Sequence, residues 1–170
     1  MIRAAGLAML IAATPAMADL PRAVAAEDPA LHRFSEATFH KYFFHVYDAT
    51  LWVRGAGWAA TQPYALEIHY AMPVSGRDLA RRSAEQIARQ GVDQARIARW
   101  QAEMARIFPD IRSGDRLVGW ALPGRETRFY FGERLVGIVA DAGFTDAFFA
   151  IWLGERTSEP ALRASLLRLP

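Results

Sequence analysis

The sequence predicts a single α+β domain built on antiparallel strands, and three observations support this prediction. The expected elements come as strands, two helices, three strands and two more helices, whereas a parallel α/β fold alternates strand and helix strictly. Short links between successive expected strands favour antiparallel pairing. The 170 residues, 52% hydrophobic and 22% charged, have the length and composition of one ordinary globular domain.

The first 18 residues have the features of a secretory signal peptide. Arg3 supplies a positive charge before an apolar stretch from Ala4 to Ala13, and small residues at Ala16 and Ala18 form an A-x-A cleavage site. The apolar stretch is shorter than the about 20 residues that a membrane helix needs. We therefore expect cleavage after Ala18 and a periplasmic or secreted protein with no integral membrane segment.

The first expected strands follow a segment without a clear pattern. Residues 19–38 are rich in Ala, Pro and charged residues, so we expect a lead-in before a domain that spans residues 39–170. Aromatic and β-branched side chains crowd residues 39–53, whose length predicts one long strand with a bend or bulge. Residues 64–72 alternate, with Glu67 on the polar face, and predict a half-buried strand.

Two helices are expected in the middle of the chain, over residues 78–90 and 93–108, where apolar side chains recur with helical spacing. Ser75 or Asp78 is the expected start signal of the first helix, and Asp93 is the expected N-cap of the second. These two helices separate the early strands from the late ones.

The last part of the chain predicts three strands and then two helices. Gly132-Glu133 is a two-residue hairpin signal between the last two strands. Ser158 is the expected cap of the final helix, with Pro160 tolerated in the first turn. The expected strands cover residues 115–122, 127–131 and 134–139, and the expected helices cover residues 145–153 and 158–169.

The composition excludes several function classes. The absence of Cys removes thiol nucleophiles, redox dithiols and Cys-ligated zinc. Lys41 is the only lysine among 20 basic residues, which leaves almost no place for a lysine Schiff base or a P-loop lysine. The 20 basic and 18 acidic residues give a net charge of +2, a balance too even to predict a nucleic-acid partner.

The motifs predict neither a metal site nor a cofactor. His40 and His45 lie five residues apart on one expected strand and hence on opposite faces, whereas metal ligands converge within about 2.2 Å of one ion. Gly55 and Gly57 follow a strand but do not open a helix of a βαβ unit. None of the serines stands in a nucleophile elbow, and capping or solvation explains them, Ser83 included.

Arginines are dense on the two middle helices, where interspersed acidic residues favour a solvated face. Among these arginines, Arg82 is the candidate for an inward-facing side chain, because it lies one turn after Leu79 and one turn before Gln86. An inward-facing Arg has the planar fork that binds a carboxylate. The strongly apolar residues 42–52 and 148–152 form either core or the walls of a cavity for a hydrophobic ligand.

At residues 42–53, 65–70 and 144–167 the chain resembles the bacterial chalcone isomerase-like family, through the combination of YFFHVYDATLWV with AFFAIWLG. The resemblance implies the chalcone isomerase fold, in which a large antiparallel sheet is backed by a layer of helices with a ligand cleft between them. Plant enzymes of this fold close a chalcone to a flavanone. A related non-enzymatic branch binds fatty acids in the same cleft.

The resemblance also places the catalytic positions of the plant enzymes on different residue types. The helix-start motif matches residues 73–76, which puts the family's Tyr on Leu79 and its Asn on Gln86. The family's Thr position falls on Tyr47, and its late-helix hydroxyl falls on Ile151. Every catalytic position that can be placed is therefore substituted.

The family's Arg position falls near residues 37–39, where the chain has no Arg, and Arg33 is the nearest upstream candidate. Ring closure needs hydrogen-bond donors placed in advance for the developing enolate, and losing one costs about 10²–10³ in rate. Leu79 and Ile151 cannot donate a hydrogen bond. We therefore assign no catalytic residue.

These arguments predict an exported, non-catalytic protein that binds a small amphipathic ligand such as a fatty acid. Tyr47, Arg82 and Gln86 are the expected polar contacts, and Leu79 and Ile151 are the expected apolar walls. Two alternatives stay open. One is an isomerase or lyase with a rearranged site, in which Tyr47 is the acid or donor. The other is an envelope interaction protein with a filled cleft and a basic helix face for its partner.

Overall fold

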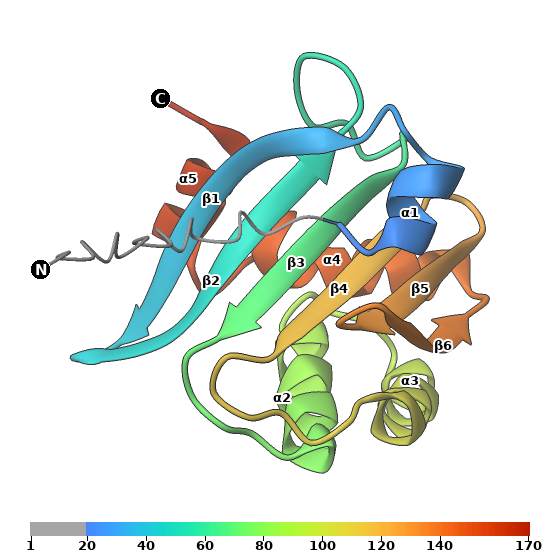
Figure 1. Ribbon diagram of the computed structural model, residues 1–170. Coiled ribbons are helices and arrows are strands. Elements are labelled where there is room, and N and C mark those ends of the chain that lie inside the picture. The colour runs from blue at the N-terminus through green and yellow to red at the C-terminus, as the bar shows by residue number, and fades with distance from the viewer. Residues whose placement is uncertain (1–19) are drawn as a thin grey trace, which may run out of the picture.

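The computed structural model describes residues 20–170, which form a six-stranded antiparallel sheet with helices on both of its faces (Figure 1). The strands are β1 (His32–Lys41), β2 (Phe44–Val53), β3 (Tyr64–Tyr70), β4 (Arg116–Leu122), β5 (Glu126–Phe131) and β6 (Arg134–Val139). The helices are α1 (Arg22–Glu27), α2 (Gly76–Ala88), α3 (Gln94–Ile107), α4 (Ala142–Leu153) and α5 (Pro160–Leu167). This architecture confirms the predicted α+β class. The predicted leader, residues 1–18, lies outside the described residues.

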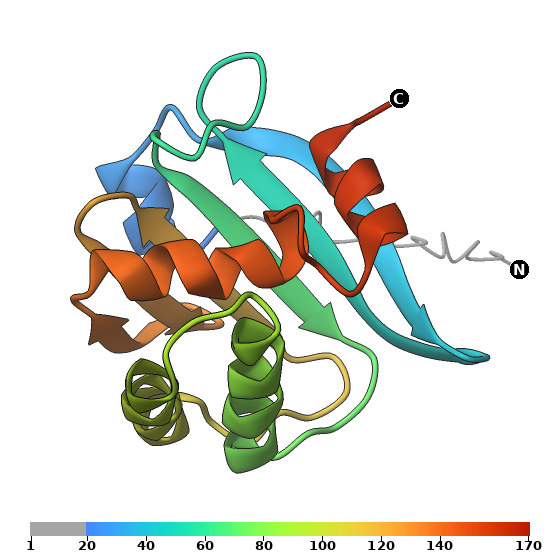
Figure 2. The ribbon, with the colours of Figure 1, turned by 180° about the vertical axis from the view of Figure 1, so that it is seen from behind.

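Neighbouring strands in the sheet are also neighbours in the chain, in the order β1 to β6, and α2 and α3 interrupt this meander between β3 and β4. Figure 2 shows α2, α3, α4 and α5 on one face of the sheet. The main core lies between this face and these helices, and its largest buried side chains include Trp100, Phe129 and Phe149. Among the helices formed by residues 20–170, none is long and apolar enough to cross a bilayer.

The opposite face of the sheet is also covered, which differs from the prediction. The expected lead-in contains α1 and most of β1, and α1 buries Val24 against this face (Figure 1). Glu67, expected on the polar face of a half-buried strand, is therefore fully buried on β3 together with Ala65, and Glu67 pairs with Arg116 at 3.7 Å. The second core contains Leu20, Val24, Leu31, Trp52, Ala65, Val118, Trp120, Leu122 and Tyr130.

The single strand expected over residues 39–53 is in fact a hairpin. Lys41 pairs with Phe44, so Tyr42 and Phe43 form a two-residue turn between β1 and β2. This turn has no Gly, Pro, Asn or Asp, and the sequence therefore carried no turn signal. Because the chain reverses here, His40 and His45 are cross-strand partners with ring centroids 5.4 Å apart, and the prediction of opposite faces was wrong. Within residues 20–170, no three metal-ligating side chains cluster.

Side-chain caps determine where most of the helices begin. Ser75 caps α2 by accepting from the backbone N–H of Asp78, and Asp93 caps α3, as predicted. Ser158 does not cap α5, whose N-cap is Glu159. The Ser158 hydroxyl instead donates to Gln86 Oε1 at 3.0 Å, because the chain passes α2 before α5 begins.

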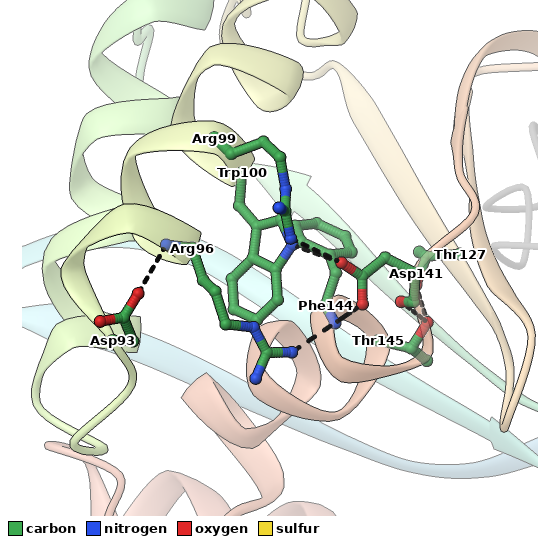
Figure 3. Close-up of polar contacts among 8 residues, drawn as sticks. All are labelled: Asp93, Arg96, Arg99, Trp100, Thr127, Asp141, Phe144 and Thr145. Carbon is green, nitrogen blue, oxygen red and sulfur yellow. Dashed lines mark hydrogen bonds and ion pairs between the residues drawn. The ribbon is translucent and has the colours of Figure 1, made fainter.

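The start of α4 is held by Asp141, which links it to α3 (Figure 3). The Asp141 carboxylate accepts from the backbone N–H of Phe144 at 3.1 Å and from the indole of Trp100 at 2.9 Å. One turn further, the buried hydroxyls of Thr145 and Thr127 share a hydrogen bond of 2.9 Å between α4 and β5 (Figure 3). These contacts fix the direction of α4, whose other end contributes a wall to the cavity described next.

Candidate functional site

A cavity of about 530 Å³ lies between strands β1 to β3, helix α2 and the C-terminal end of α4. The side chains at its bottom are buried, among them Ile68, Tyr70 and Ser83. The exposed residues among its lining form the rim: Lys41, Tyr42, Phe44, Met72, Pro73, Arg82, Glu85, Arg89 and Ser158. The site is therefore a pocket with a closed interior and an open mouth, in the size range typical of small-molecule sites.

Helix α2 forms one wall of the cavity with side chains that are spaced three and four residues apart along the helix. Leu79, Arg82, Ser83 and Gln86 all line the cavity because this spacing places them on one helix face. Leu79 contributes only carbon, while Gln86 accepts from Ser158 and keeps its side-chain amide N–H groups for other partners. This wall is thus apolar near its start and polar further along.

Aromatic side chains form the opposite wall. The indole of Trp152 on α4 donates to the phenolic oxygen of Tyr47 on β2 at 3.1 Å, and Phe39 on β1 stacks on Tyr47 with ring centroids 5.0 Å apart. Burial raises the pKa of Tyr47 to about 12, although the hydrogen bond from Trp152 lowers it. Burial also raises the pKa of Tyr70. Both phenols are consequently neutral at ordinary pH, and Tyr47 keeps its proton for donation.

Cationic side chains outweigh carboxylates around the cavity. Lys41, Arg82 and Arg89 line it, and none of the three makes a hydrogen bond or ion pair with any residue from 20 to 170. Glu85 also lines it but pairs with Arg81 at 2.6 Å, which leaves Glu159 as the other carboxylate. The unpaired positive charge favours an anionic group at the mouth.

All five residues predicted for the site, Tyr47, Leu79, Arg82, Gln86 and Ile151, line this one cavity. Their role in binding stays a prediction. Arg33, the upstream candidate for the family's Arg, pairs with Glu36 at 2.5 Å and does not line the cavity. The two apolar segments named in the sequence analysis meet here, because Tyr47 and Trp152 are hydrogen-bonded to each other in one wall of the pocket.

Most lining residues were not among the five predicted for the site, including Phe39, Tyr70, Ser83 and Trp152, although Trp152 lies in the apolar segment that was expected to form either core or a cavity wall. Ser83 was assigned to a solvated position, yet it is only 6% exposed and faces the cavity. Its position four residues after Leu79 and three before Gln86 was a usable signal, since both neighbours had already been placed on the cavity side. The aromatic residues had no such signal, because a cavity wall and a core have the same composition.

A much smaller void of about 20 Å³ lies deeper in the core and shares Ile68, Tyr70, Leu79, Ser83 and Trp152 with the main cavity. Its other lining residues are apolar apart from a glycine: Leu66, Phe108, Leu117, Gly119, Phe129, Phe148 and Phe149. The interior thus becomes more apolar with depth. The three cations of the lining are at the mouth, whereas the half-buried Glu159 lies near enough to Tyr47 to raise the pKa of its phenol.

The lining of the cavity offers a ligand hydrogen-bond donors and carbon surface. Among the described residues it contains no His, Cys or Asp, so it holds no nucleophile–imidazole pair, and its carboxylates are Glu85 and Glu159. The positions of Leu79 and Ile151 offer only carbon to a ligand. What remains is a graded surface, with cations and neutral donors at one end and aromatic carbon at the other.

Comparison with known proteins agrees with this fold. The sequence model of the chalcone isomerase-like family matches residues 12–168. An uncharacterized protein of Haemophilus influenzae is 29% identical over 125 residues, which are 73% of this chain and 61% of that protein, so the chain spans less than two thirds of its relative's length. The crystal structure of a fatty-acid binding protein of Arabidopsis thaliana superposes with a TM-score of 0.63 at 11% identity, over 81% of this chain and 87% of that one.

Proposed function

The chain belongs to the chalcone isomerase-like family, and we propose that it is an exported, non-catalytic protein that binds a fatty acid or a similar amphipathic anion in the cavity between β1–β3 and α2. One observation carries the proposal: Arg82 makes no hydrogen bond or ion pair with residues 20–170 and stands at the mouth of a pocket whose interior is apolar. Although the charge of Asp78 acts on it, this guanidinium keeps its donors for a carboxylate from outside.

The polar end of the ligand is expected between three side chains. The guanidinium of Arg82 supplies a planar pair of donors for the carboxylate. The hydroxyl of Tyr47, kept neutral by its raised pKa, and the side-chain amide of Gln86 supply further donors. The alkyl chain then lies against Leu79 and Ile151, which are the apolar part of the same lining.

Turnover is not needed to explain this lining, and two positions argue against it. The resemblance to the plant enzymes implies donors for developing negative charge at the positions of Leu79 and Ile151, and neither of these lining residues has a donor. The structural similarity to a plant protein that is named for fatty-acid binding supports the same conclusion. Export rests on the leader features of residues 1–18.

The test is binding of a matched ligand series to the purified exported protein and to Arg82→Gln. The series consists of a saturated fatty acid, its methyl ester and the corresponding alcohol, so that only the head group changes. We expect the acid to bind most tightly and Arg82→Gln to weaken the acid by roughly tenfold, the size of a partly exposed charge-assisted hydrogen bond. The ester and the alcohol should bind both proteins equally.

Arg77→Gln is the matched control, since Arg77 is exposed on the same helix but does not line the cavity. It should leave all three affinities unchanged. Absence of binding by every member of the series would contradict the proposal. Conversion of chalcones or enones by the wild type, lost in Tyr47→Phe, would instead establish a rearranged enzyme.

A further inference from the structure

The tip of the β1–β2 hairpin exposes three consecutive aromatic side chains, Tyr42, Phe43 and Phe44, which we call the aromatic tip. Their exposed fractions are 85%, 99% and 64%, the largest among the exposed apolar residues of the described chain. Figure 1 shows this hairpin end projecting beyond the sheet, away from the helices. Exposed rings of this size, gathered at one protruding point, are typical of a binding surface.

The backbone of the aromatic tip is also unusual. Tyr42 has a φ of 55°, in the left-handed region that glycine adopts most easily. Two-residue hairpin turns ordinarily use Gly, Asn or Asp at such positions. Tyr42 and Phe43 are therefore not residue types that favour this turn, and their exposed rings add little to the packing of the core.

A lysine flanks the aromatic tip. Lys41, the only lysine of the chain, precedes the tip, and the next cross-strand pair along the hairpin is His40 with His45. Residues 39–46 contain no carboxylate, and the first one along β2 is Asp48, which already bonds Thr38 at 2.6 Å and His45 at 3.1 Å. Exposed rings beside a lysine, with no carboxylate among the neighbouring residues, match the interface of a bilayer that contains anionic lipid.

We propose that the aromatic tip docks on the surface of an anionic lipid bilayer, with Phe43 inserted among the acyl chains and Lys41 at the head groups. Tyr42 suits the interface because its ring is apolar and its hydroxyl is polar. A projecting two-residue turn penetrates lipid readily but offers a folded protein partner little area, since stable protein interfaces bury about 800 Å² per partner. The lipid surface is therefore the occupant that the shape and charge favour.

This docking has a consequence for the cavity, because Tyr42 and Phe44 line its mouth as well. A docked protein would hold the mouth against the bilayer, so that an amphipathic ligand passes between lipid and cavity without crossing water. The transfer step rests on the proposed function. The docking itself does not, and ligand-free vesicles test it separately.

The experiment is co-sedimentation of the exported protein with vesicles of phosphatidylcholine, with and without phosphatidylglycerol. We expect binding to the anionic vesicles, weakened by salt, and a roughly tenfold loss of partitioning in Phe43→Ser, as expected for one ring withdrawn from lipid. Lys41→Gln should reduce partitioning to anionic vesicles by about fivefold. Phe43→Trp should keep binding, since Trp favours the same interface.

Leu135→Ser is the matched control, because Leu135 is 45% exposed on β6, at the other edge of the sheet. All variants carry the same N-terminal residues, checked by mass spectrometry, so differences between them report on the replaced side chain alone. Phe43 does not line the cavity, and fatty-acid affinity in solution should be unchanged in Phe43→Ser. Equal partitioning of Phe43→Ser and the wild type, or no partitioning of either, would overturn the proposal whatever the ligand results.

Discussion

The indole of Trp152 donates a hydrogen bond to the hydroxyl of Tyr47 at 3.1 Å, across 105 residues of sequence. This bond joins the end of α4 to β2 and closes one side of the cavity. Because the Tyr47 oxygen accepts from the indole, its own proton is directed to another acceptor. The contact therefore both shapes the pocket and prepares a neutral donor inside it.

Filling the cavity should separate binding from folding. In Ile151→Trp the larger ring enters the pocket, since Ile151 is part of its wall. We expect fatty-acid affinity to fall by at least about tenfold, which corresponds to about 1.4 kcal/mol, while the unfolding midpoint stays near that of the wild type. Ile138→Trp is the control, because Ile138 is 44% exposed on β6. Undiminished binding by Ile151→Trp would place the ligand elsewhere.

The raised pKa of Tyr47 predicts alkaline destabilisation. The unfolded phenol ionises near pH 10 and the folded one only near 12, so between these values the folded state binds more protons than the unfolded state. The free energy of unfolding therefore falls as pH rises through this window, by about 2–3 kcal/mol from this residue. Urea titrations at several pH values should show a smaller decline in Tyr47→Phe. Identical pH profiles for the two proteins would contradict the burial of this phenol.

Asp141→Ala should destabilise the protein more than the loss of a helix cap alone. The substitution removes the side-chain cap of α4. It also leaves the indole N–H of Trp100 without its acceptor, and Trp100 is buried with only 2% of its surface exposed. We expect a loss of about 2–3 kcal/mol in urea denaturation. Asp93→Ala removes only the cap of α3 and should cost about 1 kcal/mol. Equal losses would show that the Trp100 bond adds nothing.

The Asp141 carboxyl also predicts acid sensitivity. Burial raises the pKa of Asp141. This effect is outweighed by the hydrogen bonds from Trp100 and from the backbone of Phe144 and Gly143, together with the charge of Arg96, so the net pKa lies below 3.8. The stabilisation is therefore present above the unfolded value and is lost as pH falls through the folded one. Asp141→Asn should show a flatter stability profile than the wild type below pH 4. A profile parallel to that of the wild type would contradict this account.

A methyl group at Gly76 should disturb the docking of α2. A Cβ at this position would lie 2.1 Å from the carbonyl oxygen of Phe108, and a backbone atom cannot rotate away. We expect Gly76→Ala to lower the free energy of unfolding by about 1–3 kcal/mol despite the better helix propensity of Ala. In Gly57→Ala the new Cβ meets nothing within 4 Å, so its stability should change by less than about 0.5 kcal/mol. Thermal and urea unfolding of both variants test the difference.

Local signals in the sequence predicted most of the elements. The sequence correctly predicted that Ser75 and Asp93 cap the two middle helices and that apolar side chains recur along these helices with helical spacing. It also correctly predicted strands β4, β5 and β6. The Tyr42–Phe43 turn was missed because its conformation comes from strand pairing on both sides and not from turn residues. Helix α1 was missed for a similar reason, since Val24 finds its apolar contacts on strands distant in the chain.

The sequence by itself predicted the fold class, because the order and the period of the elements are local properties. The family resemblance supplied the positions Tyr47, Leu79, Gln86 and Ile151, and helical spacing added Arg82. Only the tertiary structure decided that these side chains surround an open cavity, since the same apolar residues pack equally well into a filled core. It also decided which charges are satisfied. Glu85 finds Arg81 one turn away, whereas Arg82, its neighbour on the helix, is left at the mouth without a partner in residues 20–170. Helical spacing offers Glu85 three arginines about one turn away, Arg81, Arg82 and Arg89, so spacing alone does not decide which of them pairs with it, and the packed structure does.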